Sequence, residues 1–296
     1  MKSITVVGIG NQGAKAVRAM YLGERGAVNR VLINAPGELI GNESTLTIPF
    51  VYEFGAWSPE YQLKTWFSDP DNMETLDVIL QSSTMVIICA GLGGTYSFIA
   101  KYLIMVMNEM YPEKIVLFAG TTPFREEQDY FCNSLCQKMI DFLQEHTVPY
   151  TTVANRTVRS FFHEYAEAYE NSCRFLAKVI EGIISISIHR EEMDIRQFFC
   201  KDFFLYEELE IDCIKDKIES LFGNDMDGMG VFGEICIKEF DFMFMMDIAQ
   251  IYDRYLEMRF GKINAVFWDD ESVGDDKAII RMVGSGMESK LRIGSI

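Results

Sequence analysis

The stretch Ser3-Ile-Thr-Val-Val-Gly-Ile-Gly-Asn-Gln-Gly13 lies near the start of the chain and joins a β-branched run to a cluster of glycines. Residues 3–7 predict a buried strand, and a helix is expected from about Gln12 to Leu22. Glycines let the backbone turn tightly and approach a phosphate, whose charge a helix N-terminus favours. This strand, turn and helix therefore predict a phosphate-binding loop.

A second glycine-rich turn, Ala90-Gly-Leu-Gly-Gly-Thr-Tyr-Ser97, also lies between a predicted strand and a predicted helix. Its successive backbone amides can form an anion-binding nest, and the hydroxyls of Thr95 and Ser97 can donate to phosphate oxygens. The alternative is a tight turn with a helix cap. Two such turns in one sheet are unusual for a dinucleotide-binding dehydrogenase. Moreover, the strand ending Leu32-Ile-Asn-Ala-Pro36 lacks the carboxylate that such an enzyme uses to bind ribose.

Further strands and helices alternate through the first half of the chain. Apolar runs at 30–33, 85–89 and 115–118 predict strands, and helical periodicity covers 96–110, 128–146 and 161–184. Continuous apolar strands between helices indicate a parallel sheet covered on both faces. The predicted fold class is a Rossmann-like, doubly wound α/β domain, which binds ligands at the carboxyl ends of its strands.

The second half has a different pattern and predicts a smaller α+β domain. Residues 198–221 are expected to be helical, with Glu207-Glu208-Leu-Glu210 on a solvated helix face. A further segment covers 231–237, a helix is expected near 245–260, and strands are expected near 265–268 and 278–283. The expected organisation is a nucleotide-binding domain over 1–160, a central helix over 161–187 and a C-terminal domain over 188–296.

Composition narrows the function classes. The 296 residues include 44 acidic and 27 basic side chains, a formal net charge of −17, which disfavours direct binding to nucleic acid or to anionic lipid. The longest apolar runs are too short for membrane insertion, and the first residues show no signal peptide pattern, so a cytoplasmic location is expected. The seven cysteines contain no CxxC pair, and Cys132 and Cys136 are expected to be buried thiols.

Five motifs together resemble the FtsZ/tubulin superfamily of GTPases, and FtsZ more than eukaryotic tubulin. Residues 8–17 are similar to the family's GVGGGGxNAV loop, and 90–97 to the signature AGxGGGTGxG, one residue short and with Tyr96 replacing a glycine. Residues 54–60 resemble GLGAGGNPE, 122–127 resemble TKPFxFEG, and 266–274 resemble FGxxIDExLGD. The five matches follow the family's order along the chain.

The resemblance implies an FtsZ-like protein with a GTPase domain, a long central helix and a C-terminal activation domain. Such a protein binds GTP or GDP, self-associates head to tail into cytoskeletal filaments, and hydrolyses GTP to GDP and phosphate, as in cell division. Mg²⁺ would bridge the phosphates mainly through waters. The chain ends at Leu291-Arg-Ile-Gly-Ser-Ile296 without the family's adaptor-binding tail, so tail-dependent adaptor binding is not expected.

The resemblance also implies a set of nucleotide-binding residues. Glu127 takes the place that meets the ribose, Tyr169 the stacking position, and Lys15 stands where the family has an asparagine. The guanine-reading position falls on Cys173, and Asn171 is the nearest asparagine, so guanine selectivity is an open question. The full set is Gly8, Gly10, Asn11, Gln12, Gly13, Lys15, Gly91, Gly93, Gly94, Thr95, Tyr96, Ser97, Pro123, Glu127, Tyr169, Asn171 and Cys173.

The segment His189-Arg-Glu-Glu-Met-Asp194 follows the central helix and resembles the family's NxDxxDxR. In the family these acids complete the GTP site of the next subunit, so Glu191 and Asp194 are the expected catalytic residues, acting in trans. The altered motifs imply slow hydrolysis. Three alternatives remain open: a solvated acidic helix start at this segment, a non-hydrolysing structural or regulatory homologue, and a Rossmann NAD(P)-binding oxidoreductase.

Overall fold

The computed structural model describes residues 3–21, 28–34, 46–49, 65–127, 130–153, 155–160, 162–188, 203–213, 216, 230–237, 246, 263–269 and 277–285. The chain forms two compact units, residues 1–188 and 189–296, which are described separately.

The first unit is built on a sheet of six parallel strands in the order β3-β2-β1-β4-β5-β6. This is the doubly wound Rossmann order, so the predicted fold class is confirmed. The strands are β1 (Ile4–Ile9), β2 (Val28–Asn34), β3 (Leu46–Pro49), β4 (Met85–Gly91), β5 (Ile115–Thr121) and β6 (Tyr150–Val153). The sequence patterns predicted β1, β2, β4 and β5 but missed β3 and β6, which have four residues each.

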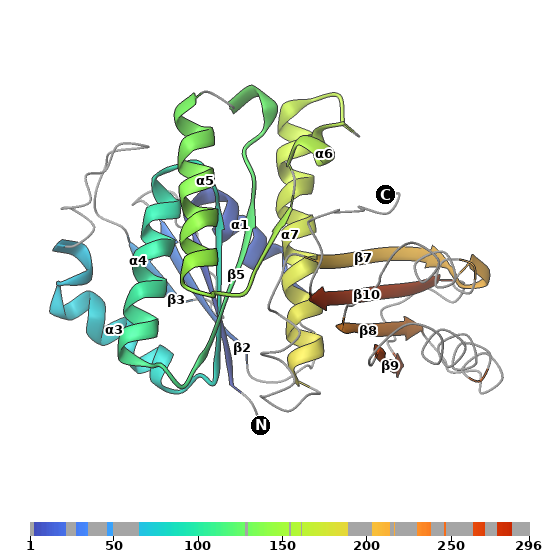
Figure 1. Ribbon diagram of the computed structural model, residues 1–296, viewed down its shortest axis with the longest axis horizontal. Coiled ribbons are helices and arrows are strands. Elements are labelled where there is room, and N and C mark those ends of the chain that lie inside the picture. Colours follow the sequence, from blue (N-terminus) through green and yellow to red (C-terminus); the bar gives the residue numbers. More distant parts are fainter. Residues whose placement is uncertain are drawn as a thin grey trace. The chain divides into compact units, whose positions relative to one another are not determined.

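Helices cover the sheet. They are α1 (Gly10–Ala19), α3 (Pro70–Gln81), α4 (Thr95–Met110), α5 (Tyr130–Glu145), α6 (Asn155–Arg159) and α7 (Tyr165–Ile188), with a 3₁₀ turn, η1 (Arg125–Glu127). Figure 1 shows α4 and α5 side by side, and α1 packs against α7. The predicted helices over 96–110, 128–146 and 161–184 are confirmed within a few residues, whereas α3 was not predicted.

The core of this unit lies where alternate residues of each strand meet the helices. Val7 and Ile9 of β1 belong to a buried cluster with residues of α3, α4 and α5, such as Leu76 and Leu103. Successive strand residues point to opposite faces, so the neighbouring β1 residues, Val6 among them, are buried on the other side. Burial on both faces explains why these strands are apolar at every position.

The second unit contains a four-stranded sheet in the order β7-β10-β8-β9. The strands are β7 (Phe203–Glu210), β8 (Gly230–Ile237), β9 (Ile263–Asp269) and β10 (Lys277–Ser285). Strand β10 is antiparallel to β7 and β8, and β9 is parallel to β8. The predicted strands within β9 and β10 are confirmed.

The predicted helix over 198–221 is wrong where the structure places β7. Phe203-Phe-Leu-Tyr-Glu-Glu-Leu-Glu210 fits a helical and an extended pattern equally, and pairing with β10 from Phe203↔Gly284 to Glu210↔Lys277 decides for the strand. The acidic run at 207–210 therefore belongs to a strand. The helix predicted near 245–260 lies outside the described residues apart from Met246. In the described ranges, no helix is both long and apolar enough to cross a membrane.

Candidate functional site

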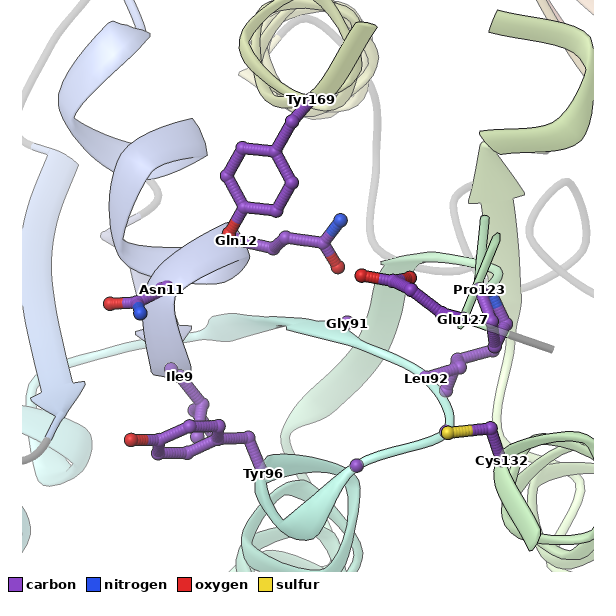
Figure 2. Close-up of a pocket in the computed structure, with 13 residues that line it drawn as sticks. Ile9, Asn11, Gln12, Gly91, Leu92, Tyr96, Pro123, Glu127, Cys132 and Tyr169 are labelled. Carbon is purple, nitrogen blue, oxygen red and sulfur yellow. The ribbon is translucent and has the colours of Figure 1, made fainter. Parts of the chain in front are cut away.

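A cavity of about 270 Å³ lies where β1 and β4 end and their helices begin (Figure 2). This is the edge at which doubly wound sheets bind ligands. Figure 2 shows Tyr169 of α7 and Tyr96 of α4 at opposite sides of the cavity. The lining residues are Ile9, Gly10, Asn11, Gln12, Gly91, Leu92, Gly93, Gly94, Tyr96, Pro123, Glu127, Cys132 and Tyr169.

The turn from β1 into α1 requires glycine at close backbone contacts. A Cβ on Gly8 would lie 2.6 Å from the Gly13 carbonyl oxygen, and one on Gly13 would lie 2.2 Å from the Cys89 carbonyl oxygen. Gly10 has a φ of +69°, which disfavours any residue with a side chain. Gly8 and Gly13 do not line the cavity. They bring α1 close to the sheet, so that its first turn starts at the cavity.

The turn from β4 into α4 has similar constraints. Gly93 has a φ of +93°, and a Cβ there would lie 2.7 Å from Pro123 Cγ. A Cβ on Gly91 would lie 2.1 Å from Gln12 Oε1, so this glycine lets the two turns approach each other. Glycine-rich loops at helix starts are suited to binding an anion through backbone amides.

Both helices begin at the cavity without a side-chain cap. Ile9 is the N-cap of α1 and Gly94 the N-cap of α4, and neither makes a side-chain capping hydrogen bond. The free N–H groups of a helix's first turn carry a partial positive charge. The cavity therefore receives two helix N-termini that can donate to an anionic ligand.

Ser97 and Thr95 were predicted to donate to phosphate. Ser97 is buried outside the cavity lining, and its hydroxyl donates to the Gly94 carbonyl oxygen at 2.5 Å. Thr95 is the first residue of α4, and its side chain lies outside the described part of the structure. Phosphate contact by either residue stays a prediction.

Two side chains of the first turn are held by the ends of other strands. Gln12 Oε1 accepts a hydrogen bond from Thr121 Oγ1 of β5 at 2.6 Å, and Asn11 Oδ1 accepts one from Asn34 Nδ2 of β2 at 3.0 Å. Asn34 is 1% exposed. A dinucleotide-binding oxidoreductase would need a carboxylate near this position, so the Asn11–Asn34 pair counts against that alternative.

Glu127, on the cavity wall, is held by two hydrogen bonds. Its Oε2 accepts from the Phe124 backbone N–H at 3.0 Å, and its Oε1 accepts from the Tyr165 hydroxyl. Burial, and next the hydrogen bond to Glu127, raise the pKa of Tyr165 above its ordinary value, so the phenol stays protonated and remains a donor at neutral pH. The orientation of the carboxylate is therefore well defined.

Tyr169 presents an aromatic wall. The Phe124 ring lies 6.2 Å from the Tyr169 ring and stacks against it, and the Tyr165 ring lies 6.3 Å away. Lys15 Nζ lies 5.0 Å from the centroid of the Tyr169 ring and forms an ion pair with Glu170. Lys15 therefore braces Tyr169 between α1 and α7 and does not line the cavity, although it was predicted to meet the nucleotide.

The two candidate base-reading residues of α7 also lie outside the cavity lining. Cys173 is 1% exposed, and burial raises the pKa of its thiol to about 12, so the thiol is neutral. The Asn171 amide donates from Nδ2 to the Glu167 carbonyl oxygen of its own helix at 3.0 Å. Because Asn171 is two residues from Tyr169, it lies on another side of the helix. Base recognition by either residue stays a prediction.

Ten of the seventeen predicted nucleotide-binding residues line this one cavity: Gly10, Asn11, Gln12, Gly91, Gly93, Gly94, Tyr96, Pro123, Glu127 and Tyr169. The predicted catalytic residues Glu191 and Asp194, and the loop at 54–60, lie outside the described residues.

Three lining residues were not predicted: Ile9, Leu92 and Cys132. Ile9 and Leu92 sit next to the glycines, so their position in the two motifs could have identified them. Cys132 was expected to be a buried thiol. Cys136 is indeed buried, but Cys132 is half-buried and faces the cavity.

Asn155, the first residue of α6, was not singled out by any sequence pattern. It is fully buried, and its Oδ1 accepts a hydrogen bond from the Ser172 hydroxyl of α7. Its Nδ2 has no partner among the described residues, which is uncommon for a buried amide. Ser172 lies one helical turn beyond Tyr169, so this donor is close to the aromatic wall.

Comparisons with known proteins identify the fold. No family model matches the sequence, and no curated protein sequence matches it. Among solved structures, the GDP-bound monomer of CetZ1 from Haloferax volcanii is 16% identical, with a TM-score of 0.76 over 99% of this chain and 96% of that one. The GTPγS-bound protofilament of CetZ2 from Haloferax volcanii is 15% identical, with a TM-score of 0.74 over 96% of this chain and 92% of that one.

A third structure, the empty FtsZ dimer of M. jannaschii, is 16% identical, with a TM-score of 0.73 over 96% of this chain and 88% of that one. The likeness spans almost the whole chain in each case. The chain therefore has the FtsZ/tubulin-like fold that the sequence motifs predicted. At these identities the likeness shows the fold alone.

Proposed function

We propose that this chain is an FtsZ/tubulin-like GTPase: it binds a guanine nucleotide in the described cavity and assembles head to tail into filaments. GTP bound to one subunit would be hydrolysed with the help of Glu191 and Asp194 of the next. The solved structures of similar fold include a GDP-bound monomer and a GTPγS-bound protofilament, which supports both parts of the proposal.

The observation that carries the proposal is the convergence of two uncapped helix N-termini, those of α1 and α4, on one cavity. Such a pair can bind a chain of two or three phosphates through backbone N–H groups, and needs no basic side chain to do so. The acidic net charge of the chain is therefore compatible with an anionic ligand.

The rest of a nucleotide also finds suitable partners. Tyr169 offers an aromatic face for a base, backed by Phe124 and Tyr165. Glu127 is an acceptor on the cavity wall, suited to a ribose hydroxyl. These assignments define the orientation of the nucleotide in the cavity: its phosphates lie at the glycine turns and its base lies beside α7.

The described lining residues offer few ligands for Mg²⁺. The ion would therefore be bound mainly by the phosphates of the nucleotide and by water. Among the described lining residues, Glu127 is the one carboxylate, and both of its oxygens accept hydrogen bonds within the protein. The described residues contain no cluster of three or more His, Cys, Asp or Glu side chains that could hold a metal ion. Mg²⁺ commonly retains several waters and binds to nucleotide phosphates, where it would neutralise charge.

Hydrolysis requires a group that orients the attacking water. In the described part of the cavity, the one carboxylate is that of Glu127, which we assign to the ribose and not to the terminal phosphate. We therefore assign the role to Glu191 and Asp194, supplied by a neighbouring copy. A contact between two different surfaces of the same protein can repeat from subunit to subunit, and it generates a filament when the repeat does not close into a ring.

The test is phosphate release from GTP with Mg²⁺ across a wide range of protein concentration. The rate per subunit is expected to rise above a threshold concentration, because the complete site forms only between subunits. Asp194→Ala and Glu191→Ala should each abolish release and leave GDP binding unchanged. A rate that is independent of concentration, or release by both variants at the parent rate, would contradict the shared site.

Nucleotide binding is measured in parallel by calorimetry with GDP. Binding of nucleotide without any phosphate release would mean that the chain is a non-hydrolysing structural homologue and not a GTPase. No binding of GDP or GTP at all would remove the proposal entirely.

A further inference from the structure

The carboxylate of Glu127 is carried by a segment with little support of its own. Glu127 ends η1, a single 3₁₀ turn whose three residues are all exposed, and Figure 2 shows the carboxylate directed into the cavity. Hydrogen bonds in a 3₁₀ turn have poorer geometry than those in an α-helix, so contacts from outside are needed to fix its side chains. The identity of these contacts bears on the proposed function, because Glu127 is the residue assigned to the ribose.

Arg159, the last residue of α6, holds η1 through the residue that precedes Glu127. Its Nε donates to Glu126 Oε1 at 2.6 Å, and the side chains of Arg159 and Glu126 are 27% and 45% exposed. The hydrogen bond from Arg159 lowers the pKa of Glu126 below its ordinary value, so Glu126 is ionised at neutral pH. The contact is therefore a charge-assisted hydrogen bond between two ionised groups.

The same guanidinium also holds the segment that leads into α7. Its Nη1 donates to the His163 carbonyl oxygen at 2.8 Å and to the Phe162 carbonyl oxygen. Arginine presents five N–H donors in a planar fork, which allows one side chain to bind a carboxylate and backbone carbonyls together. The helix α7 begins at Tyr165, shortly after these carbonyls. Arg159 therefore connects η1 to the start of α7.

The two connected segments meet at Glu127. Tyr165 donates its hydroxyl to Glu127 Oε1, and its ring packs edge-on against Phe124, with the ring centroids 5.1 Å apart. Because Glu127 belongs to η1 and Tyr165 to α7, a shift of one segment against the other would break their hydrogen bond. Arg159 itself does not line the cavity. Its effect on a bound ligand would therefore pass through the residues that it positions.

We infer that Arg159 is a positioning residue of the nucleotide site: by tying η1 to the start of α7, it places the Glu127 carboxylate where it can accept a hydrogen bond from a ribose hydroxyl. Neither Arg159 nor its partner Glu126 belongs to the nucleotide-binding set that the sequence motifs predicted. The inference rests on the proposed function, and it adds a contact between α6 and η1 that supports the binding of the ribose.

The experiment compares GDP with 2′,3′-dideoxy-GDP by calorimetry on the full chain with Mg²⁺. Arg159→Gln should weaken GDP binding by about 3–10-fold, the range expected for one ordinary hydrogen bond, because Glu127 is no longer held in place. Binding of dideoxy-GDP should change by less than about twofold, because this ligand has no ribose hydroxyl for Glu127. Equal losses for the two ligands, or no loss of GDP binding, would overturn the inference and leave the proposed function intact.

A second variant breaks the same contact from its other end. Glu126→Gln removes the charged partner on η1 and leaves the bonds from Arg159 to the segment before α7, so it should also weaken GDP and spare dideoxy-GDP. The double variant should lose no more GDP affinity than Arg159→Gln alone, because both changes break one contact. Additive losses would mean that the two residues act separately, and would overturn the inference.

Arg156→Gln is the matched control for the loss of a positive charge. Arg156 is exposed on the same helix and does not line the cavity, so its replacement should change neither dissociation constant. A loss as large as that in Arg159→Gln would assign the effect to charge alone and overturn the inference.

The parent chain separates failure of this inference from failure of the proposed function. Equal affinity of the parent for GDP and dideoxy-GDP would remove the ribose role of Glu127, and with it this inference, while nucleotide binding would stand. If the parent binds neither ligand, the proposed function fails first and this inference fails with it.

Discussion

At the scale of single residues, the site depends on backbone positions that only glycine can occupy. Gly10 and Gly93 have positive φ angles, and Gly8 and Gly13 make contacts too close for a Cβ. Gly94 differs, because a Cβ there would meet no atom within 4 Å. The glycines of the two turns therefore have separable roles.

Gly10→Ala should destabilise the protein by about 1–3 kcal/mol, because alanine resists a φ of +69° and its Cβ would lie 2.4 Å from the Tyr96 ring. Gly94→Ala is the matched control and should change stability by less than about 1 kcal/mol. Urea denaturation measures both. Equal stability of the two variants would contradict the described conformation of the first turn.

Tyr165 controls the orientation of Glu127 through one hydroxyl. Tyr165→Phe should weaken GDP binding by about fivefold, because a typical hydrogen bond contributes about 1 kcal/mol. The fold and the aromatic wall should be unchanged, since the ring remains. Binding of 2′,3′-dideoxy-GDP should be the same in parent and variant, since it lacks the hydroxyls that Glu127 would bind. An equal loss for both ligands would remove the ribose assignment.

At the scale of elements, α1 and α7 are joined at both ends of their contact. Near the cavity, Lys15 pairs with Glu170, and both side chains are about half exposed. Further along, the buried carboxylate of Glu181 accepts from the Tyr21 backbone N–H at 2.6 Å and from Lys178 Nζ at 3.0 Å. Exposed ion pairs contribute little to stability, whereas a buried and satisfied carboxylate is costly to remove.

Glu181→Ala should therefore lower the free energy of unfolding by about 1–3 kcal/mol, because the Tyr21 N–H loses its acceptor. Glu170→Gln should lower it by less than about 1 kcal/mol, since that carboxylate is largely solvated. Urea denaturation at neutral pH compares the two variants with the parent. A larger loss in the Glu170 variant would mean that the exposed end of the contact holds the helices together.

At the scale of the whole molecule, the cavity and the proposed catalytic acids belong to different units. Every residue that lines the cavity lies within residues 1–188, and Glu191 and Asp194 lie in 189–296. The first unit also has its own sheet and its own core. The first unit alone is therefore expected to retain nucleotide binding and to lose GTP hydrolysis.

A fragment of residues 1–188 should fold and bind GDP with an affinity comparable to that of the full chain. It should release no phosphate from GTP at any concentration, because it lacks both acids. Calorimetry and a phosphate assay make the comparison, with Asp194→Ala in the full chain as the control. Release by the fragment at the rate of the full chain would place the catalytic groups inside the first unit.

The sequence alone determined the two glycine turns, four strands of the parallel sheet and the fold family. These features are local: a buried parallel strand is apolar at every position, and a turn into a helix N-terminus needs glycine within a few residues. The cavity could be anticipated at those turns for the same reason. The strand over Phe203–Glu210 could not be predicted from the sequence, because its residues fit both a helical and an extended periodicity and its partner β10 lies far along the chain.

Only the tertiary structure decided which side chains reach the cavity. The motifs placed Lys15, Asn171 and Cys173 in the nucleotide site, and packing of α1 against α7 directs them to Glu170, to a helix carbonyl and into the core. Cys132 of α5, which no motif assigned to the site, does line the cavity. A motif specifies position along an element, whereas the rotation of a helix against its neighbours depends on burial of its whole apolar face.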